Sequence, residues 1–467
     1  MLFAWVKLLI VVALKEEVPA CLRTLSCTRV HALKAHDTRQ AQENSLGILT
    51  VITGVGKQGV ADLFSWLDQV DCRPYLVLNL GSCGSTESFK KGSMLCPRRF
   101  RHPQKNQHIE SLGCFPFLIK TPINIIDEAL TVDCFSEQHR AACIDMEAYF
   151  LAQSCHERQL PFSALKVLSD ANTQAEQFQI NVALKSVAAL LHELISELLT
   201  LPKDPKISVI IPTFNRQATL KRCLDSVLGQ SQPCFECWVV DDGSSDDSAR
   251  VLETYQGRLQ ILKHQKNQGV SAARNAAIAR AGGDWIMFLD SDDEWTPDKI
   301  LKQCDYLKRY PYFSILQSEE RWIRHGKPFN KKKIHQKKAG FIWELCLQRC
   351  MISPSSVMIK KELLSPPYSC SFDTDFVACE DYDLWLQLSR QFLVGLDDTC
   401  SLIKYGGHAD QLSTQTKILD RYRIMALKKA LITEKQRGFR RQLEDDLQRR
   451  SMIVEQGQRK RQKVSKS

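Results

Sequence analysis

Acidic and hydroxyl side chains follow three apolar runs in the middle of the chain. ISVIIPTFNR contains Thr213, CWVVDDGSSDDS contains Asp241 and Asp242, and WIMFLDSDDEW contains Asp290 and Asp292. In an open α/β sheet, ligands bind at the carboxyl ends of the strands. Carboxylates beside an anionic diphosphate require a cation between them, and such a cation takes oxygen ligands. The pattern predicts a site for a ribose, a base and a diphosphate bound through Mg²⁺ or Mn²⁺.

The sequence DSDDEW has an alternative interpretation as a polar turn with a helix cap before Pro297. Taken alone, that interpretation would be preferred. The acidic sequence DDGSSDDS, also at the end of an apolar run, favours the ligand site instead. Between the two acidic segments, NQGVSAARNAAI predicts a loop that begins an Ala-rich helix.

Residues 207–295 resemble the nucleotide-binding half of an inverting family 2 glycosyltransferase of the GT-A fold. The resemblance implies a nucleotide-sugar donor and a divalent metal. It implies one group of residues that contacts the nucleoside and a second group that binds the metal. Thr213, Asp241 and Asp242 would contact the nucleoside, with Arg274 nearby, and Asp290-Ser291-Asp292 would be the D-x-D motif, with Asp292 as the metal ligand and Asp290 shared between the metal and the ribose.

The segment CEDYDLWLQL at 379–388 is similar to the acceptor-facing segment of the same family. By this similarity Asp381 is the general base and Glu380 supports it. A base is needed because the acceptor hydroxyl must lose its proton as it attacks the anomeric carbon. Capping of a helix N-terminus is the alternative role for the two acids, and both roles can coexist. The later segment KYGGHADQLS also resembles this family, with His408 as a pyrophosphate contact.

A second set of motifs lies before residue 200. KEEV, TGVGKQGVA, LNLGSCGS, TVDCF, AACIDMEAYFLAQSC and KVLSDAN resemble the nucleoside phosphorylase superfamily, especially nucleosidases that act on adenosine thioethers. The resemblance implies that Glu17 activates water, that Met146 and Glu147 hold the ribose, that Asp170 protonates the leaving purine and that Phe135 stacks on the base. We expect the three acids to converge on one pocket.

Two features qualify that second resemblance. The region 95–128 is short and irregular for the superfamily, and no Arg-bearing phosphate loop is evident. Hydrolysis is therefore favoured over phosphorolysis. A degenerate domain that only binds a nucleoside, or only packs on its neighbour, remains the alternative.

The elements that must position these residues indicate an α/β protein of two domains. Apolar strands alternate with helical stretches, and LPKDPK at 201–206 predicts a linker after the helical pattern NVALKSVAALLHELISELL. Residues 1–200 are expected to form a nucleoside phosphorylase-like α/β sandwich, and 207–416 a GT-A (Rossmann-like) glycosyltransferase domain.

Residues 417–467 form a basic tail, and the net charge of the chain is +10. Phe439, Leu443 and Leu447 recur every four residues, which predicts an amphipathic helix that frays into RKRQKVSKS. A solvated helix is the preferred interpretation. The sharper alternative is attraction to anionic lipid headgroups. Nucleic-acid binding is not expected, because basic and aromatic residues do not interleave there.

The 18 cysteines lack metal-ligand spacing, so buried thiols are expected rather than zinc or disulfides. The apolar start MLFAWVKLLIVVALKEEV is broken by Lys7 and is shorter than the about 20 apolar residues of a spanning helix. It predicts a buried strand. We therefore expect a cytoplasmic protein, with peripheral binding at the inner face of the cell membrane as the alternative.

Two functions follow from these patterns. The first is an inverting glycosyltransferase that moves a sugar from a nucleotide-sugar donor to a glycan or lipid-linked acceptor, with an appended nucleosidase-like domain and a second N-glycosidic hydrolase activity. The alternative is a protein that cleaves or senses a purine nucleoside and carries a secondary glycosyltransferase domain. The intact set of acids between Asp241 and Asp381 favours the first.

Overall fold

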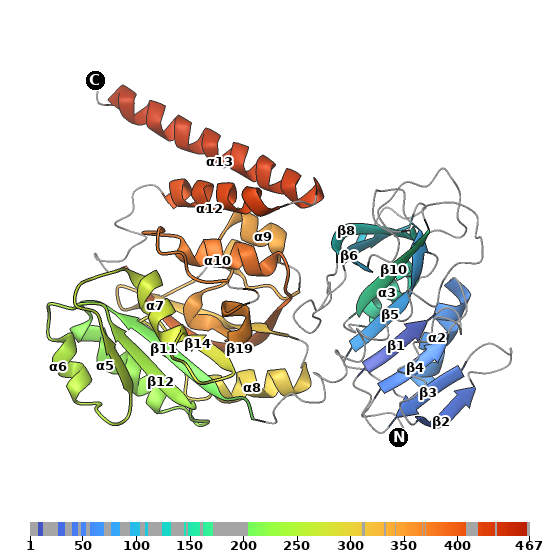
Figure 1. Ribbon diagram of the computed structural model, residues 1–467, viewed down its shortest axis with the longest axis horizontal. Coiled ribbons are helices and arrows are strands. Elements are labelled where there is room, and N and C mark those ends of the chain that lie inside the picture. The colour runs from blue at the N-terminus through green and yellow to red at the C-terminus, as the bar shows by residue number, and fades with distance from the viewer. Residues whose placement is uncertain are drawn as a thin grey trace. The chain divides into compact units, whose positions relative to one another are not determined.

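The chain divides into two compact units, Met1–Leu201 and Pro202–Ser467, each with its own sheet (Figure 1). The computed structural model describes residues 8–12, 27–32, 40–44, 48–52, 57–69, 76–84, 94–102, 108–110, 124–131, 144–145, 148–158, 162–170, 204–310, 313–330, 333–340, 342–366, 368, 370–407, 419–434 and 437–464. Both units mix helices and strands, as the alternating sequence pattern predicts.

The N-terminal unit is built on one sheet. Its described elements are β1 (Leu8–Val12), β2 (Cys27–Ala32), β3 (Gln40–Asn44), β4 (Ile48–Ile52), α2 (Lys57–Gln69), β5 (Leu76–Gly84), β6 (Met94–Arg101), β7 (His108–Glu110), β8 (Asn124–Thr131), β9 (Ile144–Asp145), α3 (Ala148–Glu157) and β10 (Phe162–Asp170). The strand order is β10-β6-β8-β9-β5-β1-β4-β3-β2, with β7 paired to β6. Strand β10 also pairs with β5, which closes part of the sheet on itself.

Part of the apolar N-terminal sequence forms strand β1. It pairs in parallel with β4 on one side and β5 on the other. Leu9, Ile10 and Val11 are fully buried. A parallel strand covered on both faces needs such a continuous apolar sequence, so the expected buried strand is present. None of the described helices is long and apolar enough to cross a membrane.

The C-terminal unit contains the candidate site. Its described strands are β11 (Ile207–Thr213), β12 (Glu236–Asp241), β13 (Gln260–Lys263), β14 (Trp285–Phe288), β15 (Glu294–Trp295), β16 (Ile315–Arg324), β17 (Lys327–Phe329), β18 (Val357–Lys360) and β19 (Val394–Gly406). Its described helices are α5 (Gln217–Leu228), α6 (Ser248–Glu253), α7 (Val270–Ile278), α8 (Lys299–Arg309), α9 (Trp343–Gln348), α10 (Glu380–Ser389), α12 (Leu419–Thr433) and α13 (Arg437–Val464), with 3₁₀ turns η3 (Lys333–His335), η4 (Pro354–Ser356) and η5 (Lys361–Leu364).

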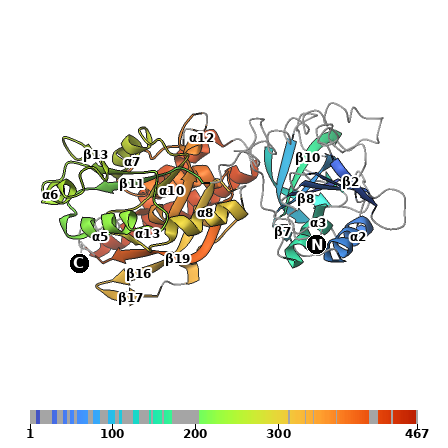
Figure 2. The same ribbon diagram turned by 90° about the horizontal axis from the view of Figure 1, so that it is seen from below.

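The sheet of this unit runs β13-β12-β11-β14-β18-β16-β19-β15, and β17 extends β16 as a hairpin (Figure 2). The first four strands are parallel, and β18 then pairs antiparallel with β14. Strands β11 and β14 are buried along their whole length, as their largely apolar sequences require. The carboxyl ends of β11, β12 and β14 therefore lie at one edge of the sheet.

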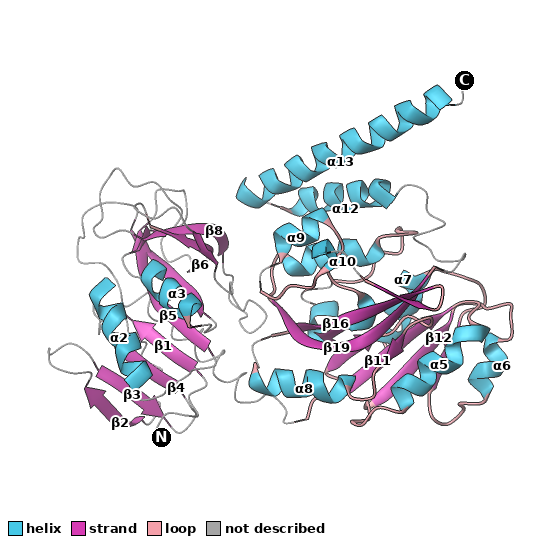
Figure 3. Cartoon of the chain, turned by 180° about the vertical axis from the view of Figure 1, so that it is seen from behind, coloured by secondary structure: helices cyan, strands magenta, loops and turns pink. Residues whose placement is uncertain are grey.

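The C-terminal helices α12 and α13 lie together over α9 and α10 (Figure 3). Phe439 and Leu443 are buried, and Arg450 donates to the carbonyl oxygens of Leu347 and Gln348, at 2.7 and 2.8 Å. These carbonyls end α9 and have no helical donor of their own. The expected amphipathic helix is therefore present, with Phe439 and Leu443 on its buried face, but it packs on the domain and continues to Val464 instead of fraying.

Candidate functional site

Two unpaired polar atoms mark the ends of β11 and β12. Thr213 and Asp241 are register neighbours on these parallel strands, and both are buried. The Asp241 Oδ1 accepts from the Ser244 amide at 2.9 Å. Among the described residues, the Thr213 hydroxyl and the Asp241 Oδ2 have no hydrogen-bond partner. Buried polar groups are rarely left unpaired, so these two atoms are suited to a ligand.

Asp242 is placed differently from its neighbour. Its Oδ1 lies 2.6 Å from His264 Nδ1 and accepts from the Gln268 amide at 3.0 Å. Its Oδ2 accepts from the Gly269 amide at 2.8 Å. Gly269 directly precedes α7. The Asp242 carboxylate is thus engaged in holding the loop that begins this helix.

Gly243 explains why that loop can approach so closely. Its φ is +78°, and a Cβ there would lie 2.8 Å from the Lys266 carbonyl carbon. Only glycine combines this backbone conformation with that contact. The sequence Asp-Asp-Gly therefore fixes the second strand end against the loop before α7.

Arg274 connects the D-x-D segment with the segment that contains Glu380 and Asp381. It projects from α7 and is almost fully buried. One terminal nitrogen lies 2.7 Å from Asp290 Oδ1, and the other lies 2.8 Å from Glu380 Oε1. Its guanidinium also lies over the ring of Phe372 at 4.8 Å. The D-x-D segment and the start of α10 are therefore connected through one side chain.

Charge and burial set the protonation of these acids. Burial raises the pKa of Asp290, but the positive charges of Arg274 and Lys404 outweigh it and hold the pKa below its usual value. Burial raises the pKa of Glu380, and the charge of Asp381 raises it further, against the opposing charge of Arg274. Asp290 is thus held as a carboxylate, and its partner across Arg274 is the more easily protonated group.

Asp292 is the least constrained acid of the D-x-D turn. Its side chain is half-buried and forms no ion pair among the described residues. Burial raises its pKa, and the negative charge of Asp290 raises it further. A cation would remove both effects, because it stabilises a carboxylate against burial and against a like charge.

Neighbouring residues hold the D-x-D turn in place. Asp293 accepts from the Ser355 hydroxyl at 2.7 Å and from the Tyr405 amide at 3.1 Å. Arg222 donates to the Asp292 carbonyl oxygen at 2.6 Å. Sequence reasoning missed Asp293, Ser355 and Arg222. Two of them lay in sequences that carried a signal: Asp293 adjoins the D-x-D motif, and Ser355 lies in ISPSSVMIKKELL, which also resembles the family.

Asp381 lies in the first turn of α10, after Cys379 in the left-handed conformation with φ of 63°. Its Oδ1 accepts from the Tyr382 amide at 2.7 Å. The Cys350 thiol lies 3.2 Å from Oδ2 and donates to it. Asp381 also borders a cavity of about 160 Å³. The carboxylate is therefore held by two donors and can reach the contents of that cavity.

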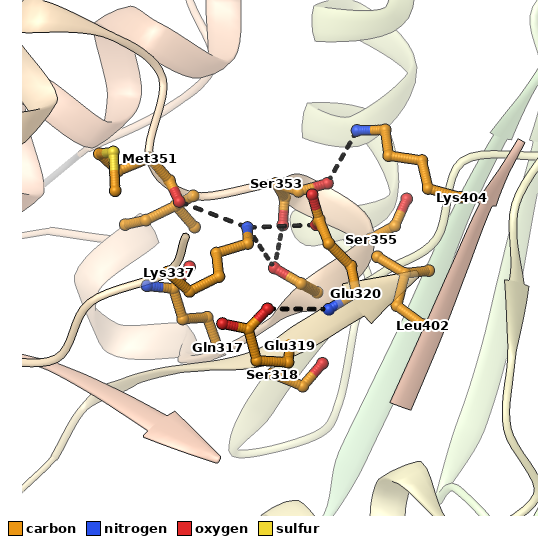
Figure 4. Close-up of polar contacts among 12 residues, drawn as sticks. Gln317, Ser318, Glu319, Glu320, Lys337, Met351, Ser353, Ser355, Leu402 and Lys404 are labelled. Atoms are coloured by element: carbon orange, nitrogen blue, oxygen red, sulfur yellow. Dashed lines mark hydrogen bonds and ion pairs between the residues drawn. The ribbon is translucent and has the colours of Figure 1, made fainter. Parts of the chain in front are cut away.

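Lys404 on β19 is the cation between these acidic groups. It borders the same cavity, and its ammonium donates to the Ser353 hydroxyl at 3.0 Å (Figure 4). Burial lowers its pKa, yet four neighbouring carboxylates outweigh burial and raise it. They belong to Glu320, Asp293, Asp290 and Asp381. Lys404 is the first residue of the family-like segment KYGGHADQLS, but only His408 of that segment was expected at the site.

Most of the nucleoside-binding residues expected in the N-terminal unit lie in parts of the chain that the structure does not describe. Glu17, Phe135, Met146 and Glu147 lie outside the described residues, as does His408. Asp170 ends β10, and its side chain is not described. The helix expected at 181–199 also lies outside the described residues. Within the described part of the chain, no group of three or more His, Cys, Asp or Glu side chains is arranged to hold a metal.

Comparisons with known proteins bear on both units. Residues 208–361 match the family model described as Glycosyl transferase family 2. Over 188 residues the chain is 32% identical to the UDP-Glc:alpha-D-GlcNAc-diphosphoundecaprenol beta-1,3-glucosyltransferase WfgD of Escherichia coli, an alignment that covers 40% of this chain and 71% of the relative. The chain belongs to glycosyl transferase family 2.

A second relative of this family 2 glycosyltransferase is the putative teichuronic acid biosynthesis glycosyltransferase TuaG of Bacillus subtilis. The identity is 32% over 161 residues, which is 34% of this chain and 63% of the relative. Among solved structures, S. aureus TarS bound to UDP-GlcNAc aligns with 52% of this chain and 72% of its own, at 20% identity and a TM-score of 0.44.

The N-terminal unit has a match of its own. Residues 135–196 of the glycosyltransferase match the model described as Phosphorylase superfamily. Both resemblances expected from the motifs are therefore confirmed, and the protein is a two-unit α/β enzyme that contains a family 2 glycosyltransferase domain.

Proposed function

We propose that the C-terminal unit transfers a sugar from a nucleoside diphosphate sugar, with UDP as the nucleotide, to an acceptor hydroxyl. The unpaired Thr213 hydroxyl and Asp241 Oδ2, side by side at two strand ends, carry this proposal. They provide a buried donor and acceptor for a nucleoside. The relative from Escherichia coli is named for a UDP-glucose donor. Asp242 would shape this site through the loop before α7 rather than touch the nucleotide.

A divalent ion, Mg²⁺ or Mn²⁺, fits beside the D-x-D turn. Asp292 would hold it with Asp290 close by, and donor phosphates would supply the remaining oxygens. The fit rests on the pKa of Asp292, which burial and the charge of Asp290 both raise. When bound, the ion would neutralise negative charge on the diphosphate. Arg274 would keep Asp290 ionised and in place through their 2.7 Å ion pair.

Asp381 would act as the general base, with Glu380 as its support. The acceptor oxygen would bond to the anomeric carbon while the bond from that carbon to the diphosphate oxygen breaks. The hydroxyl proton would pass to Asp381, and the nucleoside diphosphate would leave. A single displacement of this kind inverts the anomeric centre. The two donors to the Asp381 carboxylate, from Tyr382 and Cys350, support the orientation that the base requires.

The acceptor is proposed to be a glycan or a lipid-linked sugar. The Escherichia coli relative is named for a diphosphoundecaprenol-linked acceptor. The exposed arginines of α13, Arg440, Arg441 and Arg449, would add electrostatic attraction to anionic headgroups. The chain would then act at a membrane surface without spanning it.

Nucleoside diphosphate release tests the proposal directly. The full chain is incubated with UDP-glucose, UDP-N-acetylglucosamine and a panel of other nucleotide sugars, with Mn²⁺, with Mg²⁺ or with EDTA. We expect metal-dependent release of UDP from at least one donor, and loss of that release in Thr213→Val. Release that is equal in EDTA would exclude the metal role. The absence of binding and release with every donor would exclude the donor site.

A second candidate function belongs to the N-terminal unit. The match of residues 135–196 to the Phosphorylase superfamily includes Phe135, Met146, Glu147 and Asp170. We propose that this unit binds or hydrolyses a purine nucleoside, with Glu17 activating water and Asp170 protonating the base.

Adenine release from methylthioadenosine tests the second candidate. Release by the full chain should disappear in Asp170→Asn and persist in Asp381→Asn, because the two sites would act independently. If neither release nor binding of methylthioadenosine is detectable, the nucleosidase assignment is wrong.

A further inference from the structure

The cavity beside Asp381 has an aromatic side. Trp322 and His335 border it together with Glu320, Lys337 and Lys404. Its volume of about 160 Å³ is many times the roughly 10–15 Å³ that a cavity needs to hold one water molecule. A cavity bordered by aromatic side chains and a few polar groups suits a small organic ring.

Trp322 is held in a fixed orientation. It lies on β16 opposite Phe329 of β17, and the two rings are nearly parallel, with an interplanar angle of 11° and centroids 6.1 Å apart. Its indole nitrogen donates to Glu320 Oε1 at 2.8 Å. His335 approaches the indole with ring centroids 5.3 Å apart. The indole is therefore anchored at its polar edge and along the hairpin.

Glu320, which anchors the indole, is itself fixed. Its Oε2 lies 3.2 Å from the Lys337 ammonium, and both side chains are almost fully buried. Lys337 also donates to the Met351 carbonyl at 3.3 Å (Figure 4). Burial raises the pKa of Glu320, but Lys337 and Lys404 outweigh it and hold the pKa at about 2. Glu320 thus stays ionised and keeps accepting from the indole.

We infer that this cavity takes one pyranose ring of the acceptor and that Trp322 is the residue that selects it. The apolar C–H face of the sugar would lie on the indole, and a ring hydroxyl would reach Asp381. A polarised C–H face is attracted to the negative face of an aromatic ring. The inference rests on the proposed role of Asp381 as the base, and it assigns the acceptor site to the β16–β17 hairpin.

Saturation-transfer NMR with octyl pyranosides tests the inference on the full chain. The probes are octyl β-glucoside, octyl β-galactoside and octyl N-acetyl-α-glucosaminide, with octanol as the chain-only control. At least one pyranoside should receive its strongest saturation at ring C–H protons. Trp322→Ala should weaken binding roughly tenfold, whereas Trp322→Phe should retain most of it because an aromatic face remains.

Phe235→Ala is the control, because Phe235 is an exposed aromatic residue that lies outside the cavity. It should bind pyranosides like the wild type. Circular dichroism checks the fold of each variant. Saturation limited to the octyl chain, or equal binding by Trp322→Ala, would overturn the inference.

UDP release from the donor separates the two possible failures. Phe235→Ala should hydrolyse the donor without acceptor like the wild type, because Phe235 does not border the cavity. If pyranosides bind through Trp322 but no donor is turned over, the proposed transfer fails and the sugar site stands. If the donor is turned over but Trp322→Ala leaves pyranoside binding unchanged, the assignment of the acceptor site fails alone.

Discussion

The two acidic pairs of the C-terminal unit, Asp290 with Asp292 and Glu380 with Asp381, are arranged alike. In each pair Arg274 holds one member, at 2.7 Å from Asp290 and 2.8 Å from Glu380. The other member forms no ion pair among the described residues. The first pair ends a strand and the second begins a helix, so their elements differ completely.

In each pair, one acid forms an ion pair with Arg274 and the other does not. A buried carboxylate needs a cation or several hydrogen-bond donors. Arg274 supplies the cation for one acid of each pair, and the second acid has no ion-pair partner among the described residues. Asp292 has a raised pKa, which favours a metal, whereas Asp381 receives an amide and a thiol donor. The same guanidinium thus connects two acids with separate proposed tasks.

The largest effect is expected for Asp292→Asn. If Asp292 is the metal ligand, the variant should lose detectable transfer and metal-dependent nucleotide binding while keeping its fold. UDP release and thermal shift with and without Mn²⁺ measure both. EDTA should reproduce the loss in the wild type. Full activity of the variant would place the metal ligand elsewhere.

Asp381→Asn should impair chemistry and spare donor binding. We expect kcat to fall by roughly 10²–10⁴-fold, the usual contribution of a positioned base, with nucleotide affinity near that of the wild type. Titration with UDP and a turnover assay separate the two quantities. A collapse of UDP affinity would instead assign Asp381 to the nucleotide site.

Arg274→Met should affect both pairs at once. Removal of one partner of a buried ion pair costs about 3–5 kcal/mol of stability, because the remaining carboxylates lose their cation. Arg274→Lys keeps the charge but cannot form both contacts. Thermal unfolding and turnover should therefore rank wild type above lysine and lysine above methionine. Equal stability of all three would mean that Arg274 does not link the pairs.

Glu320 gives the smallest expected effect, seen in stability against pH. Its pKa is lowered to about 2 from 4.5, so the folded state gains stability above pH 4.5 and loses it as the pH falls toward 2. The difference corresponds to about 3 kcal/mol. The gap in unfolding midpoint between wild type and Glu320→Gln should narrow from pH 6 to pH 2.5. A constant gap would refute the ion pair with Lys337.

The sequence by itself determined the fold class and the positions of the chemical groups along the chain. Apolar runs of strand length predicted β11, β12 and β14, and the acidic and hydroxyl residues at their ends predict a ligand site at that edge of the sheet. The order of the motifs identified both families, which the family models confirm. Strand positions and motifs can be predicted locally, because hydrophobic periodicity and turn residues depend on residues that are close in the sequence.

Only the tertiary structure decided how the acids divide their work. Arg274 and Glu380 are separated by 106 residues, and no periodicity predicts their contact. Asp241 and Asp242 are adjacent in sequence, yet one has an unpaired oxygen and the other is engaged by a loop. Alternate side chains of a strand end face opposite ways, so neighbouring acids meet different surroundings.

The structure also determined how α13 packs and where the β16–β17 hairpin places Trp322. The basic sequence of α13 favoured a solvated helix, but Arg450 is buried, where it donates to the carbonyls of Leu347 and Gln348 and pairs with Asp446. Trp322 carried no motif, and only the pairing of β16 with β17 and the packing of α10 bring it to the cavity of Asp381. Long-range packing determines such contacts, since it joins residues that no local pattern connects.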